Sequence, residues 1–184
     1  MTRAPLRALT FAVLLAAQAV ALTAQTGAAP AAIAYQFSFP QREHRLMDVT
    51  VTFTGVPDGP LRLHMSRSSP GRYALHQFAK NLFDLKVTDG AGAPLAVTRT
   101  TRDEWVVPTQ GRTVSVSYRV FGDRVDGTYL SVDSTHAHIN MPAVILWAVG
   151  PDRLPNEVRF EPPAGSNWRV ATQLFPGPDE FTFT

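Results

Sequence analysis

The sequence of 184 residues contains no cysteine. Disulfide bonds and a cysteine nucleophile are therefore excluded, and so is a lipid anchor attached to an N-terminal cysteine. A fold without disulfide bonds must be stabilised by a hydrophobic core. The chain is long enough to build such a core within a single domain.

Acidic residues are missing near the N-terminus, where Arg3 and Arg7 precede an apolar stretch over residues 8–22. Small residues follow, with alanines placed as cleavage sites up to Ala24. A positive start, an apolar middle and a small-residue end are typical of a secretory signal peptide. The stretch is shorter than the ~20 residues that a membrane-spanning helix needs. We therefore expect a signal peptide at residues 1–24.

No later segment is long and apolar enough to cross a membrane, so we expect no membrane span after the signal peptide is removed. Residues 25–32 are small and polar, and they predict a flexible lead-in to a domain at residues 33–184. The expected location is outside the cytoplasm, either periplasmic or secreted.

No surplus of charge remains once the signal peptide is removed. The whole sequence has 17 Lys and Arg residues against 15 Asp and Glu residues. Because Arg3 and Arg7 leave with the signal peptide, 15 basic and 15 acidic residues remain. A nucleic-acid-binding domain needs basic residues gathered on one face, whereas here they are scattered singly among acids. We expect no nucleic-acid partner.

Helical patterns are sparse, and apolar residues instead alternate with polar ones at a period of two, which is typical of half-buried strands. The clearest examples are residues 47–54, 61–65, 83–88 and 114–120, with shorter strands expected at Val158 and Phe160 and at Trp168 and Val170. Fifteen prolines and twelve glycines argue against long helices, and residues 73–82 predict a helix of a turn or two. The fold class is therefore all-β, a β-sandwich of mainly antiparallel strands with at most one short helix.

Two further segments bear on the organisation of the domain. The apolar run at residues 142–149 is long enough for a strand buried on both faces, and we expect it to be the central strand with Trp147 in the core or in an interface. Residues 180–184 begin another alternating segment, and the sequence stops within it. We therefore expect the domain to be truncated at its C-terminal end.

Zinc chemistry requires three protein ligands and a general base, commonly as H-E-x-x-H on a helix, and none of the five histidines is followed by glutamate. His136 and His138 are the closest pair, and on a strand they would point to the same side. A metal would still need a third ligand from Asp133 or His76. We favour two polar histidines on an exposed or cleft-facing strand over a small metal-binding protein.

Other catalytic motifs are also missing. The stretch at residues 66–71 lacks the glycines of a G-x-S-x-G nucleophile elbow. Gly90 and Gly92 are not followed by the residues of a phosphate-binding loop. Pro70 and Gly71 predict a sharp turn before Tyr73, and we favour an aromatic ring packed on the core over a direct ligand contact.

A series of short segments then carries a resemblance to known proteins. In order they are residues 33–40, 55–61, 69–73, 78–81, Trp105, residues 118–121, 133–136, Asn140, and residues 161–165 and 168–172. Their order and spacing resemble the N-terminal domain of the glycyl aminopeptidase family, which are zinc metallopeptidases that often carry a PDZ domain. The chain departs from that pattern at Asn140-Met141, where the family commonly has Asn-Gly.

The resemblance implies a β-sandwich that packs against a thermolysin-like catalytic domain, and that domain would bring the H-E-x-x-H zinc site. It implies an enzyme that removes N-terminal glycine and alanine from peptides. No cofactor is expected in this chain, since zinc would belong to the catalytic domain, which this chain lacks and which would be its partner within the same polypeptide.

Two functions remain open. The chain is either the non-catalytic N-terminal domain of an exported zinc aminopeptidase or a free-standing periplasmic β-sandwich binding module, and the abrupt alternating end favours the first. No catalytic or metal-binding residue is assigned. The residues expected in a cleft or a domain interface are Tyr73, Asp133, His136, His138 and Asn140.

Overall fold

The computed structural model describes residues 32–110, 113–150 and 154–184. The expected signal peptide lies outside these residues, as does almost all of the expected lead-in. Ala32, which the sequence placed at the end of the lead-in, is the first residue of a strand. None of the helices in the described ranges is long and apolar enough to cross a membrane.

The larger sheet has six strands in the order β12-β11-β1-β2-β7-β4. These strands are β1 (Ala32–Ser38), β2 (Leu46–Thr54), β4 (Leu82–Asp89), β7 (Val114–Phe121), β11 (Asn156–Glu161) and β12 (Thr182–Phe183). All neighbours are antiparallel except β1 and β11, which run parallel. The parallel pair thus brings an early segment of the domain sequence next to a late one.

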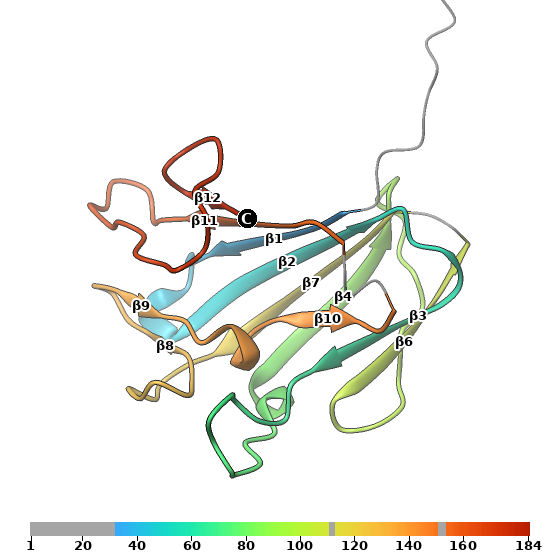
Figure 1. Cartoon of the computed structure of the whole chain (residues 1–184), viewed down its shortest axis with the longest axis horizontal. Coiled ribbons are helices and arrows are strands. Elements are labelled where there is room, and N and C mark those ends of the chain that lie inside the picture. Colours follow the sequence, from blue (N-terminus) through green and yellow to red (C-terminus); the bar gives the residue numbers. More distant parts are fainter. Residues whose placement is uncertain (1–31, 111–112, 151–153) are drawn as a thin grey trace, which may run out of the picture.

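The smaller sheet has the order β10-β3-β6-β5, and its antiparallel strands face the larger sheet (Figure 1). They are β3 (Asp58–Met65), β5 (Thr98–Arg99), β6 (Glu104–Gln110) and β10 (Leu146–Ala148). A separate hairpin consists of β8 (Ser131–Val132) and β9 (Ala137–His138). The helical elements are short 3-10 turns, namely η1 (Arg42–His44), η2 (Phe78–Asn81) and η3 (Met141–Ala143). The all-β sandwich expected from the sequence is confirmed, and η2 is the short helix expected within residues 73–82.

The core lies between the two facing sheets. On β2 the apolar residues Met47, Val49, Val51 and Phe53 are at most 1% exposed, while the threonines between them point outward. Each such side chain contributes about 1.5–3 kcal/mol to stability when it is fully buried. The period of two in the sequence is therefore the direct cause of the two-layer arrangement.

Two buried tyrosines fasten the edge strand β10 to the larger sheet. The Tyr118 hydroxyl accepts a hydrogen bond from the Leu146 N–H at 2.9 Å and donates one to the Val144 carbonyl at 2.8 Å. The Tyr35 hydroxyl donates to the Leu146 carbonyl at 3.0 Å. Burial raises the pKa of Tyr35 to about 12 and that of Tyr118 still further above its ordinary value. Both phenols are therefore neutral donors at physiological pH.

The expectation of a central strand at residues 142–149 is wrong. Pro142 lies in the first turn of η3, and only the three residues of β10 follow as a strand. Since β10 pairs with β3 alone, it is an edge strand, and Trp147 on its outer face is 39% exposed. A run of apolar residues predicts a strand with a neighbouring strand on each side. Here the hydroxyls of Tyr35 and Tyr118 take the place of the second neighbour, because they bond the backbone carbonyl and N–H of Leu146.

The regular alternation expected at residues 83–88 is also only partly correct. The register with β7 shifts between Phe83 and Lys86, and Asp84 has a φ of 53°. This β-bulge turns the Phe83 ring outward, where it is 47% exposed, whereas Val87 stays buried.

Candidate domain-interface site

A groove of about 910 Å³ is lined by residues of the β8–β9 hairpin and of the connection between β11 and β12. Figure 1 shows the hairpin and this connection on the same side of the sandwich. The walls of the groove are residues 137–142 on one side and residues 168–174 on the other, and Ser69, Pro70 and Gly127 close its rim. We call it the end groove. It combines apolar and polar surface, and its lining includes Phe160 of β11 and Phe39, which directly follows β1.

Asn140, one of the expected interface residues, lines the end groove and ties three segments together. Its side-chain amide donates to the Ser69 hydroxyl at 3.1 Å and to the Thr128 carbonyl. Its own carbonyl accepts the Ala143 N–H at 2.8 Å, which starts η3. Met141 lies within η3 and is not among the described residues with positive φ, so this turn does not need the glycine that the resembling family commonly has there.

His138 also lines the end groove, as the last residue of β9. Among the described residues, it and Arg169 are the ionisable residues that line this groove, and none of these lining residues carries a carboxylate. The guanidinium of Arg169 therefore gives this lining a positive charge.

Tyr73 does not pack on the core, so this expectation is wrong. It is fully exposed at 107%, and Leu75 nearby is 63% exposed. The turn itself is as expected, because Gly71 has a φ of 74° and the Arg72 N–H donates to the Ser69 carbonyl at 3.1 Å. The Pro-Gly turn thus projects an aromatic ring outward from the loop whose Ser69 and Pro70 line the end groove.

The loop that carries Tyr73 is fastened at its base. The Arg67 carbonyl accepts hydrogen bonds from the N–H groups of His76 at 2.7 Å and Gln77 at 3.1 Å. Ser69 is buried and bonded to Asn140. The exposed apolar side chains are consequently held on a loop whose two ends are fixed.

Asp133 and His136 lie in the turn between β8 and β9 and do not line the end groove. The Asp133 carboxylate accepts the Thr135 hydroxyl at 2.6 Å and the N–H groups of Thr135 at 2.7 Å and His136 at 2.9 Å. These bonds, the Thr135 hydroxyl first, hold the pKa of Asp133 well below its ordinary value. The carboxylate therefore serves to build the turn.

The histidine pair does not form part of a metal site in the described part of the chain. His136 lies 3.3 Å from Asp133, whereas His76 hydrogen-bonds with the Tyr129 hydroxyl at 3.0 Å and stacks on Phe78. No group of three or more His, Cys, Asp or Glu side chains that could hold a metal occurs among the described residues. The zinc that the resemblance implies would belong to the catalytic domain and not to the side chains described here.

Residues 168–174 form the wall that sequence analysis did not assign to a site. Trp168 packs on Phe39 with ring centroids 5.1 Å apart, and Val170 and Leu174 are partly buried against the core. The sequence pattern predicted a strand at Trp168 and Val170, but this segment is neither helix nor strand. The prediction of a strand is therefore wrong, although the alternation of its side chains is present.

A second, more apolar hollow of about 340 Å³ adjoins the end groove and shares Met141 and Leu174 with it. It lies beside β10 and β1, where Tyr35, Ile145 and Trp147 line it. The two hollows therefore lie side by side, the mixed end groove and a more apolar one beside the edge strand β10.

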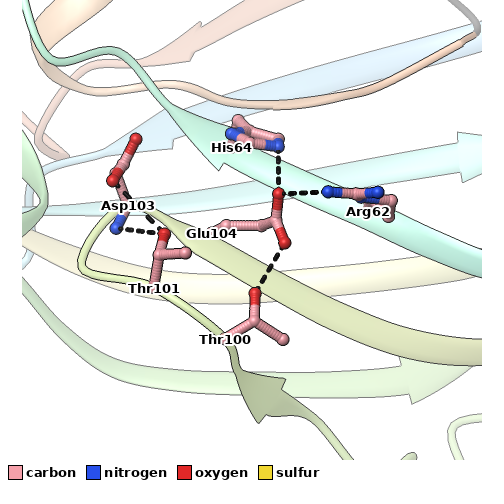
Figure 2. A network of polar contacts seen from close by, with 6 residues as sticks. All are labelled: Arg62, His64, Thr100, Thr101, Asp103 and Glu104. Atoms are coloured by element: carbon pink, nitrogen blue, oxygen red, sulfur yellow. Dashed lines mark hydrogen bonds and ion pairs between the residues drawn. The ribbon is translucent and has the colours of Figure 1, made fainter.

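A separate polar network lies on the smaller sheet, away from the end groove. Figure 2 shows the Glu104 carboxylate between Arg62, His64 and Thr100. The oxygen–nitrogen distances to Arg62 Nη2 and His64 Nε2 are both 2.7 Å, and the Thr100 hydroxyl donates at 2.6 Å. Hydrogen bonds from Arg62 and then Thr100 lower the pKa of Glu104 to about 2. A carboxylate so weakly basic joins β3 to β6 rather than acting as a general base.

Comparisons with known proteins give a family match and a similar fold. The family described as the Peptidase M61 N-terminal domain matches residues 34–184. The crystal structure of an aminopeptidase N family protein from Idiomarina loihiensis is similar with a TM-score of 0.75 and 22% identity, over 82% of this chain and 26% of that chain. An M1 zinc metallopeptidase from Deinococcus radiodurans aligns with a TM-score of only 0.33 and 12% identity, over 85% of this chain and 39% of that one. No curated protein matches the chain.

Proposed function

The chain belongs to the family of peptidase M61 N-terminal domains, and from this membership we propose that it is the non-catalytic N-terminal domain of an exported zinc aminopeptidase. In this proposal the domain packs against a catalytic metallopeptidase domain of the same polypeptide. The observation that carries the proposal is the family match, which begins two residues into β1 and includes β12.

The chemistry of the described residues supports a non-catalytic role. The end groove offers His138 and Arg169 as ionisable side chains, and the Asp133 carboxylate is occupied by its own turn. Peptide hydrolysis by a zinc enzyme needs three ligands and a general base. In the proposal these groups belong to the catalytic domain, which would supply the zinc-bound water, while this domain supplies a surface.

The fold similarity supports the same division. The chain spans about a quarter, 26%, of the Idiomarina loihiensis aminopeptidase N family protein. A sandwich of this size is thus one part of a much larger protein there. We propose the same relation here, with the end groove and its exposed rim as the surface that faces the rest of the enzyme.

Export is the second part of the proposal. It is supported by the positive, apolar and small-residue pattern of residues 1–24. It is consistent with the lack of cysteine, because a domain with a large core does not depend on disulfide bonds outside the cytoplasm. Fractionation of cells that express the chain, with N-terminal sequencing of the product, tests this part. A product that retains residues 1–24 in the cytoplasm would contradict it.

A reconstitution assay tests the catalytic part. Residues 25–184, a catalytic metallopeptidase domain, and the two joined in one polypeptide are each incubated with zinc and with glycyl and alanyl peptides. We expect no release of N-terminal residues by residues 25–184 alone and full activity only in the joined protein. Turnover by residues 25–184 alone would overturn the proposal. Full activity of the catalytic domain without its partner would show that this domain is not needed.

A further inference from the structure

The first four residues of the end-groove wall at residues 168–173 have the side-chain arrangement of a β-strand, and Thr172 and Gln173 after them are both exposed. Trp168 and Val170 are half-buried and pack against the core, whereas Arg169 and Ala171 between them are exposed. Successive side chains of an extended chain point to opposite faces, so this alternation is what a strand on the surface of a core produces.

The backbone of this segment, in contrast, has no partner. Within the described parts of the chain, no N–H or C=O group of residues 168–173 makes a backbone hydrogen bond. Before the segment, the Ser166 N–H donates to the Pro163 carbonyl at 3.0 Å within a local turn, and after it Phe175 exchanges two bonds of 2.9 Å with Thr184. A strand-like segment with unpaired backbone groups, packed on the core through Trp168 and Val170, is a ready template for an added strand.

We propose that residues 168–173 are an open strand edge on which an extended segment of the catalytic domain docks by backbone pairing. The identity of this partner rests on the proposed function. The pairing itself rests on the alternation and on the unpaired backbone described above.

The surroundings favour a folded domain over a single peptide as the occupant. Tyr73 and Leu75 are exposed on the loop that supplies Ser69 and Pro70 to the end groove. Val125 is 83% exposed on the loop that supplies Gly127. Exposed apolar side chains gathered on several loops around one groove are typical of an interface between proteins.

The charges that line the end groove indicate which residues the partner strand should carry. The groove contains Arg169 and His138 but no carboxylate among its lining residues. An added strand that carries apolar side chains toward the groove and a carboxylate beside Arg169 would complement it. We therefore expect an apolar strand with at least one acidic residue.

Amide hydrogen exchange measured by mass spectrometry tests the proposal directly. In residues 25–184 alone, we expect the amides of residues 168–173 to exchange at rates close to those of an unstructured peptide. In the joined, zinc-loaded protein without substrate, we expect the exchange of this segment to slow by at least about tenfold. The amides of β2 serve as an internal control, because they are paired with β1 and β7 in both proteins.

Two proline substitutions locate the pairing edge. The N–H groups of neighbouring residues in a strand point to opposite sides, so Ala171→Pro and Thr172→Pro each remove a donor on one side. We expect one of them to weaken the association of residues 25–184 with a separately produced catalytic domain by about tenfold or more, and the other to have a smaller effect. Ala171→Ser and Thr172→Ser are the matched controls, and unchanged unfolding midpoints would show that the proline variants still fold.

The outcomes separate this proposal from the proposed function. An active joined protein in which residues 168–173 remain unprotected would overturn the open-strand proposal and leave the proposed function standing. Protection that requires added peptide would assign the edge to substrate, and protection of the chain alone that rises with its concentration would assign it to a second copy. Either result would overturn docking of the catalytic domain. An inactive joined protein would count against the proposed function, because activity is measured separately from exchange.

Discussion

The centre of the larger sheet and the wall of the end groove share one sequence pattern but differ in what surrounds it. Strands β1, β2 and β7 alternate apolar and polar residues, and β2 is paired along its length on both sides. Residues 168–171 alternate in the same way, and residues 168–173 have no backbone partner among the described residues. Alternation thus shows which side chains face a core, but not whether the backbone is paired.

The difference separates stability from binding within one domain. Side chains at the centre, such as Phe37, are completely buried, whereas Trp168 at the groove is only half-buried and Tyr73 at its rim is fully exposed. Regions with few buried contacts and unpaired backbone are where proteins open locally and bind partners. We therefore expect substitutions at the centre to change folding and those at the groove to change association.

The largest effect should come from truncating a core aromatic. Phe37→Ala removes a completely buried ring that stacks on Phe160 with centroids 5.4 Å apart. We expect a loss of about 3–5 kcal/mol in the free energy of unfolding, measured by urea denaturation. Trp168→Ala should cost less than half of this, because its ring is only partly buried. Equal losses would mean that the groove wall is as integral to the fold as the central strands.

The next effect concerns the edge strand that borders the second hollow. Tyr118→Phe leaves the Leu146 N–H and the Val144 carbonyl without their partner, and we expect a loss of about 1–3 kcal/mol in the free energy of unfolding. Tyr35→Phe removes a single bond to the Leu146 carbonyl and should cost less. The pair is matched in chemistry and burial. A larger loss for Tyr35→Phe would contradict the view that Tyr118 holds β10 in place.

The sequence predicted the sandwich well because its strands are specified by local alternation. Residues 47–54 and 114–120 became β2 and β7 almost residue for residue. It failed where tertiary bonds decide, as at residues 142–149, where tyrosine hydroxyls from other strands take the place of a neighbouring strand. The bulge at Phe83 likewise depends on pairing with β7, which alternation alone does not specify.

The candidate site was predicted only in part for a related reason. His138 and Asn140 line the end groove, and Tyr73 stands on a loop at its rim. Asp133 and His136 were grouped with them because they are close in sequence, but their turn uses their polar atoms internally. The sequence did not predict Arg169 as a residue of the site, because Arg169 and His138 line the same groove only in the folded chain. The alternation of Trp168 and Val170 was the one pattern in the sequence that singled out this segment.

A smaller, pH-dependent effect on the free energy of unfolding should come from the Glu104 network. This network lies on the paired strands β3 and β6 but near the surface. The pKa of Glu104 in the folded protein, about 2, is below its ordinary value of 4.5. Its contribution to stability is therefore complete above about pH 4.5 and is lost as the pH falls toward 2. We expect Glu104→Gln to be less stable than the parent protein at pH 6, and the difference to shrink by pH 3.

Thermal unfolding at a series of pH values measures this difference. Glu157→Gln, on the exposed face of β11, is the matched control and should show no such convergence. A gap between Glu104→Gln and the parent protein that stays constant from pH 6 to pH 2 would show that the carboxylate charge does not stabilise the β3–β6 pair.

The smallest effect on stability should come from the rim of the end groove, where the effect on association should be clearest. Tyr73→Ser exchanges a fully exposed ring for a hydroxyl, so we expect the free energy of unfolding to change by no more than about 0.5 kcal/mol. If the rim faces a catalytic domain, the same substitution should weaken the association measured by calorimetry by about tenfold. Phe83→Ser is the control, because that ring is also exposed but belongs to β4, which contributes no residue to the lining of the groove. Equal weakening of the association by both variants would mean that the binding surface is not confined to the surroundings of the end groove. Strand β4 of the larger sheet would then also belong to the binding surface.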